Sequence, residues 1–215
     1  SLSIDVSLHI GSLLAVLVYF YKDIISFVEN KILFFKIFIS SLPVVIVGFL
    51  LVETGIIDQI RNIKIIAWTT LIFGFLLYFS DKFKLEKNLE KNFSYKSAIF
   101  IGLFQILSLV PGVSRSGIAI TAARLLNFKR VDAAKISFLL SIPILSAVTF
   151  FGLKNLISSE NIFLAKINLI SIFLSFLFSL ITIKYFLRYI VKFNLNIFVY
   201  YRIILSLVLF AIAYL

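Results

Sequence analysis

Six long apolar segments, separated by short polar stretches, constrain this chain more than any other feature of its sequence. Each comes near the length of about 20 residues that a helix needs to cross the hydrocarbon core of a bilayer. The chain is 61% hydrophobic, with a mean hydropathy of +1.10, well above that of soluble globular domains. We therefore predict an all-α polytopic membrane protein. Its six transmembrane helices are predicted over approximately residues 4–21, 37–52, 65–79, 133–153, 163–187 and 197–215.

A polar stretch over residues 111–117, with the sequence Pro-Gly-Val-Ser-Arg-Ser-Gly, interrupts a further apolar region. The apolar segments on its two sides, residues 97–110 and 118–128, are each too short to cross a bilayer. Polar groups at membrane depth are costly unless they are buried in protein or line a cavity. The pattern predicts a re-entrant helix–loop–helix over about residues 97–128, with the polar stretch at its tip.

The residue types of this loop are suited to binding a phosphate group. Gly112 and Gly117 allow the backbone to direct successive N–H groups at one anion. The next helix is predicted to begin near Ser116, so its unpaired N–H groups and positive dipole end face the loop. Arg115 can hold phosphate oxygens in bidentate fashion, and the hydroxyls of Ser114 and Ser116 can bind, cap the helix or attack. In a soluble protein a plain turn with a serine cap would be the commoner explanation, and the membrane setting favours the anion site.

The distribution of lysine and arginine indicates whether this segment crosses the membrane or returns. If it returns, most basic residues fall on one side, and only Arg61, Lys64, Lys154 and Lys166 fall on the other. If it crosses once, the two sides become nearly equal. The positive-inside rule therefore favours the re-entrant form, with both ends of the hairpin at the cytoplasm. The charges of residues 81–96 alternate in sign, which indicates a solvated loop.

Three spans, a hairpin and three further spans predict an inverted-repeat architecture within one integral membrane domain, residues 1–215. Residues 1–93 would be the remainder of a first repeat, and residues 94–215 a second repeat that contains the hairpin. The sequence has no methionine, from which we expect a fragment whose first hairpin lies upstream of Ser1. The lack of cysteine excludes disulfides, and a single histidine excludes a histidine-based metal site.

Several polar residues in apolar surroundings are weaker candidates. Arg202 lies within an apolar span, where it would bind substrate or extend to the interface. Thr121, one turn into the second half-helix, would line the pocket or bond to its own helix, and Gln105 would hydrogen-bond across the hairpin. His9, one turn from Asp5, fits a helix–helix hydrogen bond better than a catalytic role.

Residues 105–143 contain the polar loop and, at their end, the sequence Ile-Ser-Phe-Leu-Leu-Ser-Ile-Pro. Together with residues 4–20 and the late pair Tyr201-Arg202, they resemble the undecaprenyl-diphosphate phosphatases of bacterial envelopes, the bacitracin-resistance proteins. The resemblance runs along essentially the whole chain. It implies hydrolysis of undecaprenyl diphosphate to undecaprenyl phosphate and inorganic phosphate, which recycles the cell-wall lipid carrier. It also implies a multi-pass protein of the bacterial inner membrane.

The resemblance also implies roles for individual residues. Arg115 would bind the diphosphate and stabilise transition-state charge, and Ser114 would bind phosphate or support the nucleophile. A divalent cation, Mg²⁺ or Ca²⁺, is implied as cofactor, although no metal ligand can be identified in this chain. The family's glutamate-rich segment and its Ser-Ser-Thr-Gly-His-like motif do not occur here, so we expect the chain to be incomplete for catalysis. The substrate-binding residues would be Gly112, Val113, Ser116, Gly117, Thr121, Gln105 and Arg202.

A polyprenyl-phosphate carrier, or another secondary transporter, is the alternative function. A broken helix between inverted repeats is typical of transporters, which need binding groups and alternating access. A phosphatase also needs a nucleophile and a proton donor. The residues of this chain supply binding groups, and the family resemblance favours the phosphatase. The expected partners are the isoprenoid diphosphate lipid and the bilayer, without nucleic acid despite the net charge of +11; the oligomeric state stays open, a homodimer included.

Overall fold

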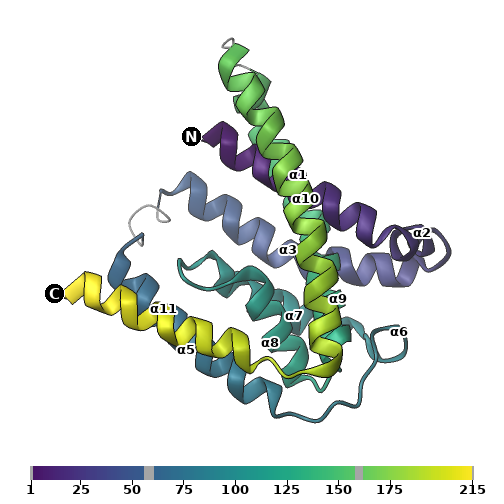
Figure 1. The fold of residues 1–215 in the computed structure, drawn as a ribbon. Helices are drawn as coiled ribbons and strands as arrows, with labels where there is room; N and C mark the ends of the chain where they lie inside the picture. Colours follow the sequence, from purple (N-terminus) through teal and green to yellow (C-terminus); the bar gives the residue numbers. More distant parts are fainter. Residues whose placement is uncertain (1, 56–60, 158–161, 215) are drawn as a thin grey trace.

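The computed structural model describes residues 2–55, 61–157 and 162–214, and these residues are almost entirely helical. Figure 1 shows the helices crossing one another around a short helical hairpin near the middle of the molecule. In chain order the elements are α1 (Leu2–Tyr19), α2 (Tyr21–Glu29), α3 (Lys31–Glu53), α5 (Ile63–Asp81), α6 (Leu89–Asn92), α7 (Tyr95–Ile106), the 3-10 helix η1 (Leu107–Leu109), α8 (Arg115–Leu125), α9 (Arg130–Ile157), α10 (Ile162–Lys192) and α11 (Asn196–Tyr214).

Five of the described helices, α3, α5, α9, α10 and α11, are long and apolar enough to cross a membrane. The remaining predicted span, the first one over residues 4–21, corresponds to α1, whose apolar part, Ser3–Tyr19, is shorter. Large apolar side chains are exposed on the outer faces of these helices, such as Phe150 (73%) and Leu169 (67%). Contiguous apolar surface of this kind is suited to lipid rather than to water. The prediction of an all-α polytopic membrane protein is confirmed.

The chain between α1 and α3 differs from the prediction of a loop after the first span. Tyr21–Glu29 forms a separate amphipathic helix, α2, instead. On α2, Ile24 packs against the core while Ile25 is exposed. α3 begins at Lys31 because the side chain of Asn30 caps it, accepting a hydrogen bond from a first-turn N–H at 3.0 Å. The apolar periodicity of α2 is too short to stand out in the sequence, and this helix is recognised only in the structure, where it packs against the core.

The helix–loop–helix predicted over residues 97–128 is present as α7, η1 and α8. α7 starts where Ser94 caps it, the serine Oγ accepting from the Ser97 N–H at 3.2 Å. α7 has 12 residues and α8 has 11, so neither arm is long enough to cross a bilayer. The two arms pack against each other. α8 begins at Arg115, one residue before the predicted start.

Helices that are distant in sequence pack in pairs around this hairpin. α1 packs against α9 and α10, α5 against α11, and α3 against α7 (Figure 1). Glycines lie where two of these pairs meet. A side chain at Gly11 of α1 would collide with Ser175 of α10, and one at Gly102 of α7 would collide with the backbone of Ser40 in α3. Small residues at these crossings let the backbones approach closely, which fixes the walls around the hairpin.

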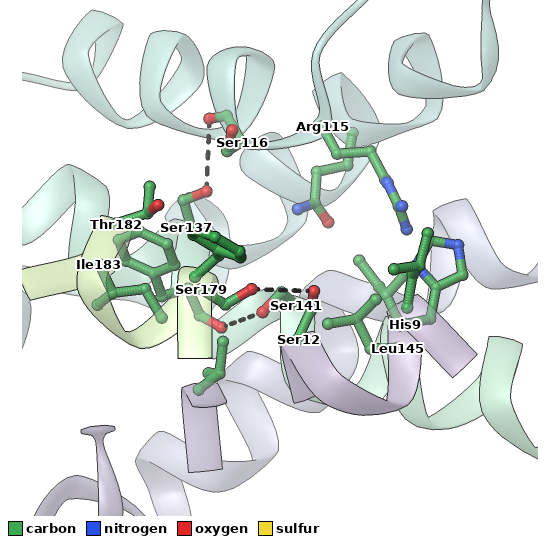
Figure 2. A pocket seen from close by; sticks show the side chains of 16 residues that line it. His9, Ser12, Arg115, Ser116, Ser137, Ser141, Leu145, Ser179, Thr182 and Ile183 are labelled. Atoms are coloured by element: carbon green, nitrogen blue, oxygen red, sulfur yellow. Dashed lines mark hydrogen bonds between the residues drawn. The ribbon is translucent and has the colours of Figure 1, made fainter. Parts of the chain in front are cut away.

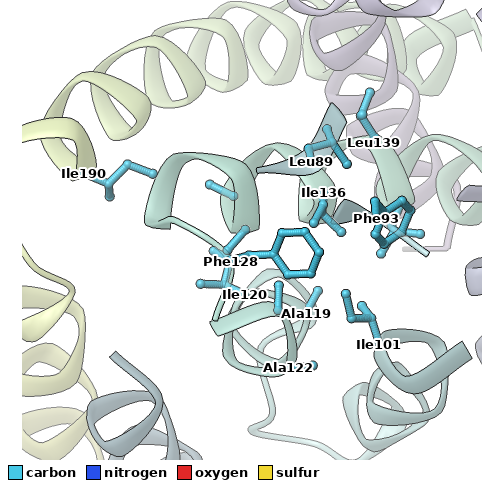
Figure 3. Packing of buried hydrophobic residues seen from close by; sticks show 14 of the residues in the cluster. Leu89, Phe93, Ile101, Ala119, Ile120, Ala122, Phe128, Ile136, Leu139 and Ile190 are labelled. Carbon is cyan, nitrogen blue, oxygen red and sulfur yellow. The ribbon is translucent and has the colours of Figure 1, made fainter. Parts of the chain in front are cut away.

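Buried apolar side chains are concentrated at the base of the hairpin, where α8 meets α9 (Figure 3). Phe128 is fully buried in the turn between the two helices. Ala119 and Ile120 of α8 and Ile136 and Leu139 of α9 belong to the same cluster. The base of the hairpin is therefore anchored in the core of the molecule.

The segment over residues 81–96, interpreted from its charges as a solvated loop, is partly buried. Leu89 lies in the core, and Asp81 is only 7% exposed. Asp81 forms ion pairs with Arg124 at 3.4 Å and with Arg130 at 2.7 Å. For Asp81 the interpretation as solvated is wrong, because the ion-pair partners of this carboxylate lie far away in the sequence. We call Asp81, Arg124 and Arg130 the Asp81 ion cluster.

Arg124 lies at the centre of this cluster, fully buried. Asp81 Oδ2 also accepts a hydrogen bond from the Leu195 N–H at 3.0 Å. The cluster therefore joins the end of α5, the base of the hairpin, the start of α9 and the connection between α10 and α11. The Arg124 guanidinium further donates to four backbone carbonyl groups, those of Asp81 (3.1 Å), Lys84 (3.2 Å), Phe83 and Phe128.

Replacing Asp81 with asparagine should strongly destabilise the fold. The substitution leaves the buried Arg124 charge without its counter-ion, which costs about 3–5 kcal/mol in comparable sites. Thermal unfolding of the purified protein in detergent should show a clearly lower Tm for Asp81→Asn. Glu86→Gln is the matched control, because Glu86 pairs with Lys84 only at the surface. Equal Tm values for the two variants would contradict a structural role for the cluster.

Candidate active site

Two threonines hold the tip of the hairpin against α5. Thr69 Oγ1 lies 2.6 Å from the Pro111 carbonyl oxygen, the shortest of its hydrogen-bond contacts, and Thr70 Oγ1 donates to the Gly112 carbonyl oxygen at 3.4 Å. Gly112 has a φ of +90°, and a Cβ there would lie 2.7 Å from the Ile66 carbonyl oxygen. Only glycine fits this position without strain. The role of both threonines could not be predicted from the sequence. Threonine hydroxyls in apolar helices commonly bond to their own backbone, so the sequence does not distinguish those that bond to another segment.

Ser114 starts α8 as its N-cap. Its Oγ accepts from the Gly117 N–H at 3.1 Å and lies 3.2 Å from Ser116 Oγ. Of the roles considered for this hydroxyl, capping is the one that the geometry shows directly. The cap satisfies one N–H of the first turn and leaves the positive end of α8 at the loop. Arg115 is the first residue of this helix, so its side chain and the helix terminus act on the same region.

A cavity of about 610 Å³ lies beside the start of α8, lined by side chains from α1, α7, α8, α9 and α10 (Figure 2). Three of the residues predicted for the site, Gln105, Arg115 and Ser116, line it. His9 of α1 lines it as well. The tertiary structure thus brings the two arms of the hairpin together with the first helix. Further hydroxyl groups that sequence reasoning did not identify complete the polar lining, namely those of Ser12, Ser137, Ser141, Ser179 and Thr182.

Several of these hydroxyl groups also hold the walls of the cavity together. Ser12 Oγ of α1 lies 3.1 Å from both Ser175 Oγ and Ser179 Oγ of α10. Ser137 Oγ of α9 donates to the carbonyl oxygen of Ser116 at 3.4 Å. The spacing of four residues between the two α10 serines, in an otherwise apolar helix, is the sequence signal that could have indicated this contact.

The cavity combines unsatisfied polar groups with an apolar wall. Within the described part of the chain, the Arg115 guanidinium has no hydrogen bond or ion pair, and the lining contains no carboxylate. Gln105 is 3% exposed, and its Oε1 has no hydrogen-bond partner. Buried polar atoms without partners are rare in native proteins, so Gln105 Oε1 is available to a ligand, and the N–H donors of Arg115 are available because that side chain is exposed. The site therefore suits an anionic group that carries an apolar body, which would contact Leu8, Val16, Phe138, Ile144, Leu145, Phe178 and Ile183.

The remaining predicted residues lie around the loop rather than in the cavity lining. Thr121 is buried and donates to the Gly117 carbonyl oxygen at 2.8 Å, so it bonds to its own helix. Val113 is buried as well. Arg202 of α11 packs against Gly74 of α5, and its Nη2 would lie 3.4 Å from a Cβ at Gly117. Arg202 thus reaches the start of α8 from α11. Substrate contacts of these residues stay predictions.

The described residues offer no ligand set for the divalent cation that the resemblance implies. They contain no group of three or more histidine, aspartate or glutamate side chains close enough to hold a metal ion. The acidic side chain nearest in sequence to a lining residue of α1 is Asp5, and it does not line the cavity. The cation therefore does not fit the residues present in this part of the chain.

Replacing Gly112 with alanine tests how the loop rests on α5. The positive φ costs an alanine about 1–2 kcal/mol, and contact with the Ile66 backbone adds to this. We expect Gly112→Ala to lower the Tm in detergent more than Gly55→Ala does. Gly55 is the matched control because its φ is also positive, at +67°, while a Cβ there would meet nothing within 4 Å. Equal decreases would show that backbone strain alone matters and that the contact with α5 does not.

The chain is similar to known proteins along nearly its whole length. The model of the family described as "Bacitracin resistance protein BacA" matches residues 1–208. The chain is 53% identical over 215 residues to an undecaprenyl-diphosphatase of Pelagibacter ubique, an alignment that covers all of this chain and 84% of that protein. It is 36% identical over 225 residues to the protein of that name from Jannaschia sp., covering 99% of this chain and 84% of the relative. The corresponding protein of Saccharophagus degradans is 39% identical over 226 residues, with 99% and 84% covered. The chain therefore belongs to the bacitracin resistance protein BacA family.

Proposed function

We propose that this protein hydrolyses undecaprenyl diphosphate to undecaprenyl phosphate and inorganic phosphate, which recycles the lipid carrier for cell-wall synthesis. Family membership and the names of the relatives support this activity. Within the structure, one observation carries it. Among the residues that the structure describes, none is a counter-ion to the Arg115 guanidinium, which lies at the start of α8 in a cavity with an apolar wall.

The two parts of the substrate match the two parts of the site. The terminal phosphate lies at the positive end of α8, where the guanidinium of Arg115 holds two of its oxygens. The Nε2 amide group of Gln105 donates to a further oxygen, since this side chain lines the same cavity. The first isoprene units lie along apolar side chains such as Phe138, Leu145 and Phe178. The remaining isoprene units of the substrate extend between helices of the protein into the lipid bilayer.

Hydrolysis breaks the bond between the bridging oxygen and the terminal phosphorus. In the net reaction a water oxygen bonds to that phosphorus and gives up a proton to the solvent, inorganic phosphate forms, and undecaprenyl phosphate leaves with the electron pair of the broken bond. Negative charge accumulates on the phosphoryl oxygens in the transition state, where the guanidinium of Arg115 stabilises it. Ser114 supports the reaction by holding the first turn of α8 in place, through its bond to the Gly117 N–H.

A divalent cation would supply Lewis-acid stabilisation of the phosphates in such a reaction. The resemblance implies Mg²⁺ or Ca²⁺, but the described residues do not supply its ligands. Activity should therefore be measured with each ion added.

The proposed location is the bacterial inner membrane. The proposed partners are the isoprenoid diphosphate lipid and the bilayer. The basic residues then serve topology rather than nucleic-acid binding. A homodimer stays a prediction. The transporter alternative is not favoured, because the relatives are named as diphosphatases.

Substituting Arg115 with lysine should remove most of the activity in the full-length protein. A point charge cannot replace the planar fork that holds two phosphate oxygens, and losing one transition-state donor costs about 100-fold or more in kcat. Phosphate release from a C55 isoprenoid diphosphate measures this loss. Arg188→Lys is the matched control, because Arg188 is exposed on α10 away from the cavity. Near-normal turnover by Arg115→Lys would refute the assigned role.

The proposed activity itself is tested by phosphate release from the same lipid, for this chain and for the full-length gene product, in detergent with magnesium or calcium. Release by the longer protein alone supports a phosphatase whose remaining catalytic groups lie outside these residues. If residues 1–215 release phosphate without any further residues, the catalytic groups must lie within this chain, with the loop of residues 114–116 as their source. Binding of the lipid by both without any release would overturn the proposal in favour of a carrier.

A further inference from the structure

His9 is a polar residue of the cavity that neither the proposed mechanism nor the loop uses. It lies on α1, half-buried, and faces the cavity together with Arg115 of α8 (Figure 2). Its sequence context favoured a hydrogen bond between helices. No such bond joins its imidazole to another residue in the described part of the chain. The ring nitrogens of His9 are therefore free to contact a ligand.

The charges around His9 favour an anion at this position. The imidazole and the guanidinium of Arg115 are both hydrogen-bond donors, and they approach one space from two different helices (Figure 2). Asp5, one turn away on α1, is exposed and does not line the cavity. The guanidinium only donates and the imidazole carries at least one N–H, so an anion between the two side chains can accept a hydrogen bond from each.

The position of His9 is fixed by the packing of α1 on α10. Gly11 lies so close to α10 that any side chain there would collide with Ser175. Ser12 Oγ lies 3.1 Å from Ser175 Oγ and from Ser179 Oγ. Both contacts are within one turn of His9, so α1 presents the imidazole from a rigid wall. A donor held in this way can bind a ligand without a large ordering cost.

We propose that His9 is a substrate-binding residue that donates a ring N–H to the diphosphate, on the phosphate that Arg115 does not hold. This inference rests on the proposed function. With Arg115 on the terminal phosphate, His9 contacts the phosphate attached to the isoprenoid. The two side chains together recognise a diphosphate, whereas a monophosphate can occupy only one of the two positions.

The test uses His9→Leu and His9→Gln in the full-length protein. Leucine removes the donor while keeping the approximate size, so we expect the KM for an isoprenoid diphosphate to rise about tenfold, with kcat changed much less. Glutamine retains an N–H donor and should restore most of the affinity. A second readout is the increase in Tm caused by farnesyl methylenediphosphonate, a probe that cannot be hydrolysed. His9→Leu should lose this increase and His9→Gln should keep it.

Val18→Ala is the matched control, because Val18 is on the same helix but 52% exposed on its outer face. It should bind the diphosphonate as the wild type does. Unchanged diphosphonate binding by His9→Leu would overturn the inference. Equal losses for His9→Leu and His9→Gln, accompanied by a lower Tm without ligand, would also overturn it and show a structural role. If the wild-type protein binds the diphosphonate through His9 but releases no phosphate, the proposed function fails while the inference stands.

Discussion

The buried carboxylate of Asp81 is the interaction on which the rest of this structure depends. It pairs with Arg124 and Arg130 and accepts the Leu195 N–H, so one side chain joins four parts of the chain. Burying the charges of Asp81 and Arg124 is expensive, and it is tolerated here because Arg124 is surrounded by carbonyl groups that satisfy its N–H donors. The cluster fixes the base of the hairpin relative to the transmembrane helices on both sides of it.

The tip of the hairpin is fixed by different means. Hydroxyl groups of α5 contact the carbonyl oxygens of Pro111 and Gly112, and Gly112 lies directly on the α5 backbone. With both ends held, the start of α8 has little freedom to move. Arg115 and Gln105 can then keep unsatisfied polar atoms facing a cavity, because the surrounding packing maintains a geometry that these two residues do not stabilise themselves.

Much of the architecture followed from two one-dimensional patterns. Apolar length predicted the long helices, and the placement of lysine and arginine predicted that the interrupted segment returns rather than crosses. The failures have one physical cause. α2 is a short helix whose existence depends on packing by Ile24, and the role of Asp81 depends on partners more than 40 residues away. The amphipathic pattern of α2 extends over only nine residues, and the Asp81 contacts leave no periodic signal in the sequence. The same holds for Thr69 and Thr70, which resemble ordinary hydroxyls of an apolar helix.

The sequence by itself determined the membrane environment, the broken helix and the chemical types at its tip, because these depend on composition and on residues adjacent in the chain. The anion-binding role of Gly112, Ser114 and Arg115 could be predicted for that reason, and it stays a prediction. Only the tertiary structure decided which residues share the cavity. It joined Gln105, Arg115 and Ser116 to His9 and to serines of α1, α9 and α10, and it left Thr121 bonded to its own helix. The physical reason is that the cavity lining depends on how closely whole helices approach one another. A glycine such as Gly11 sets that distance only when the helix it contacts, here α10, is in place.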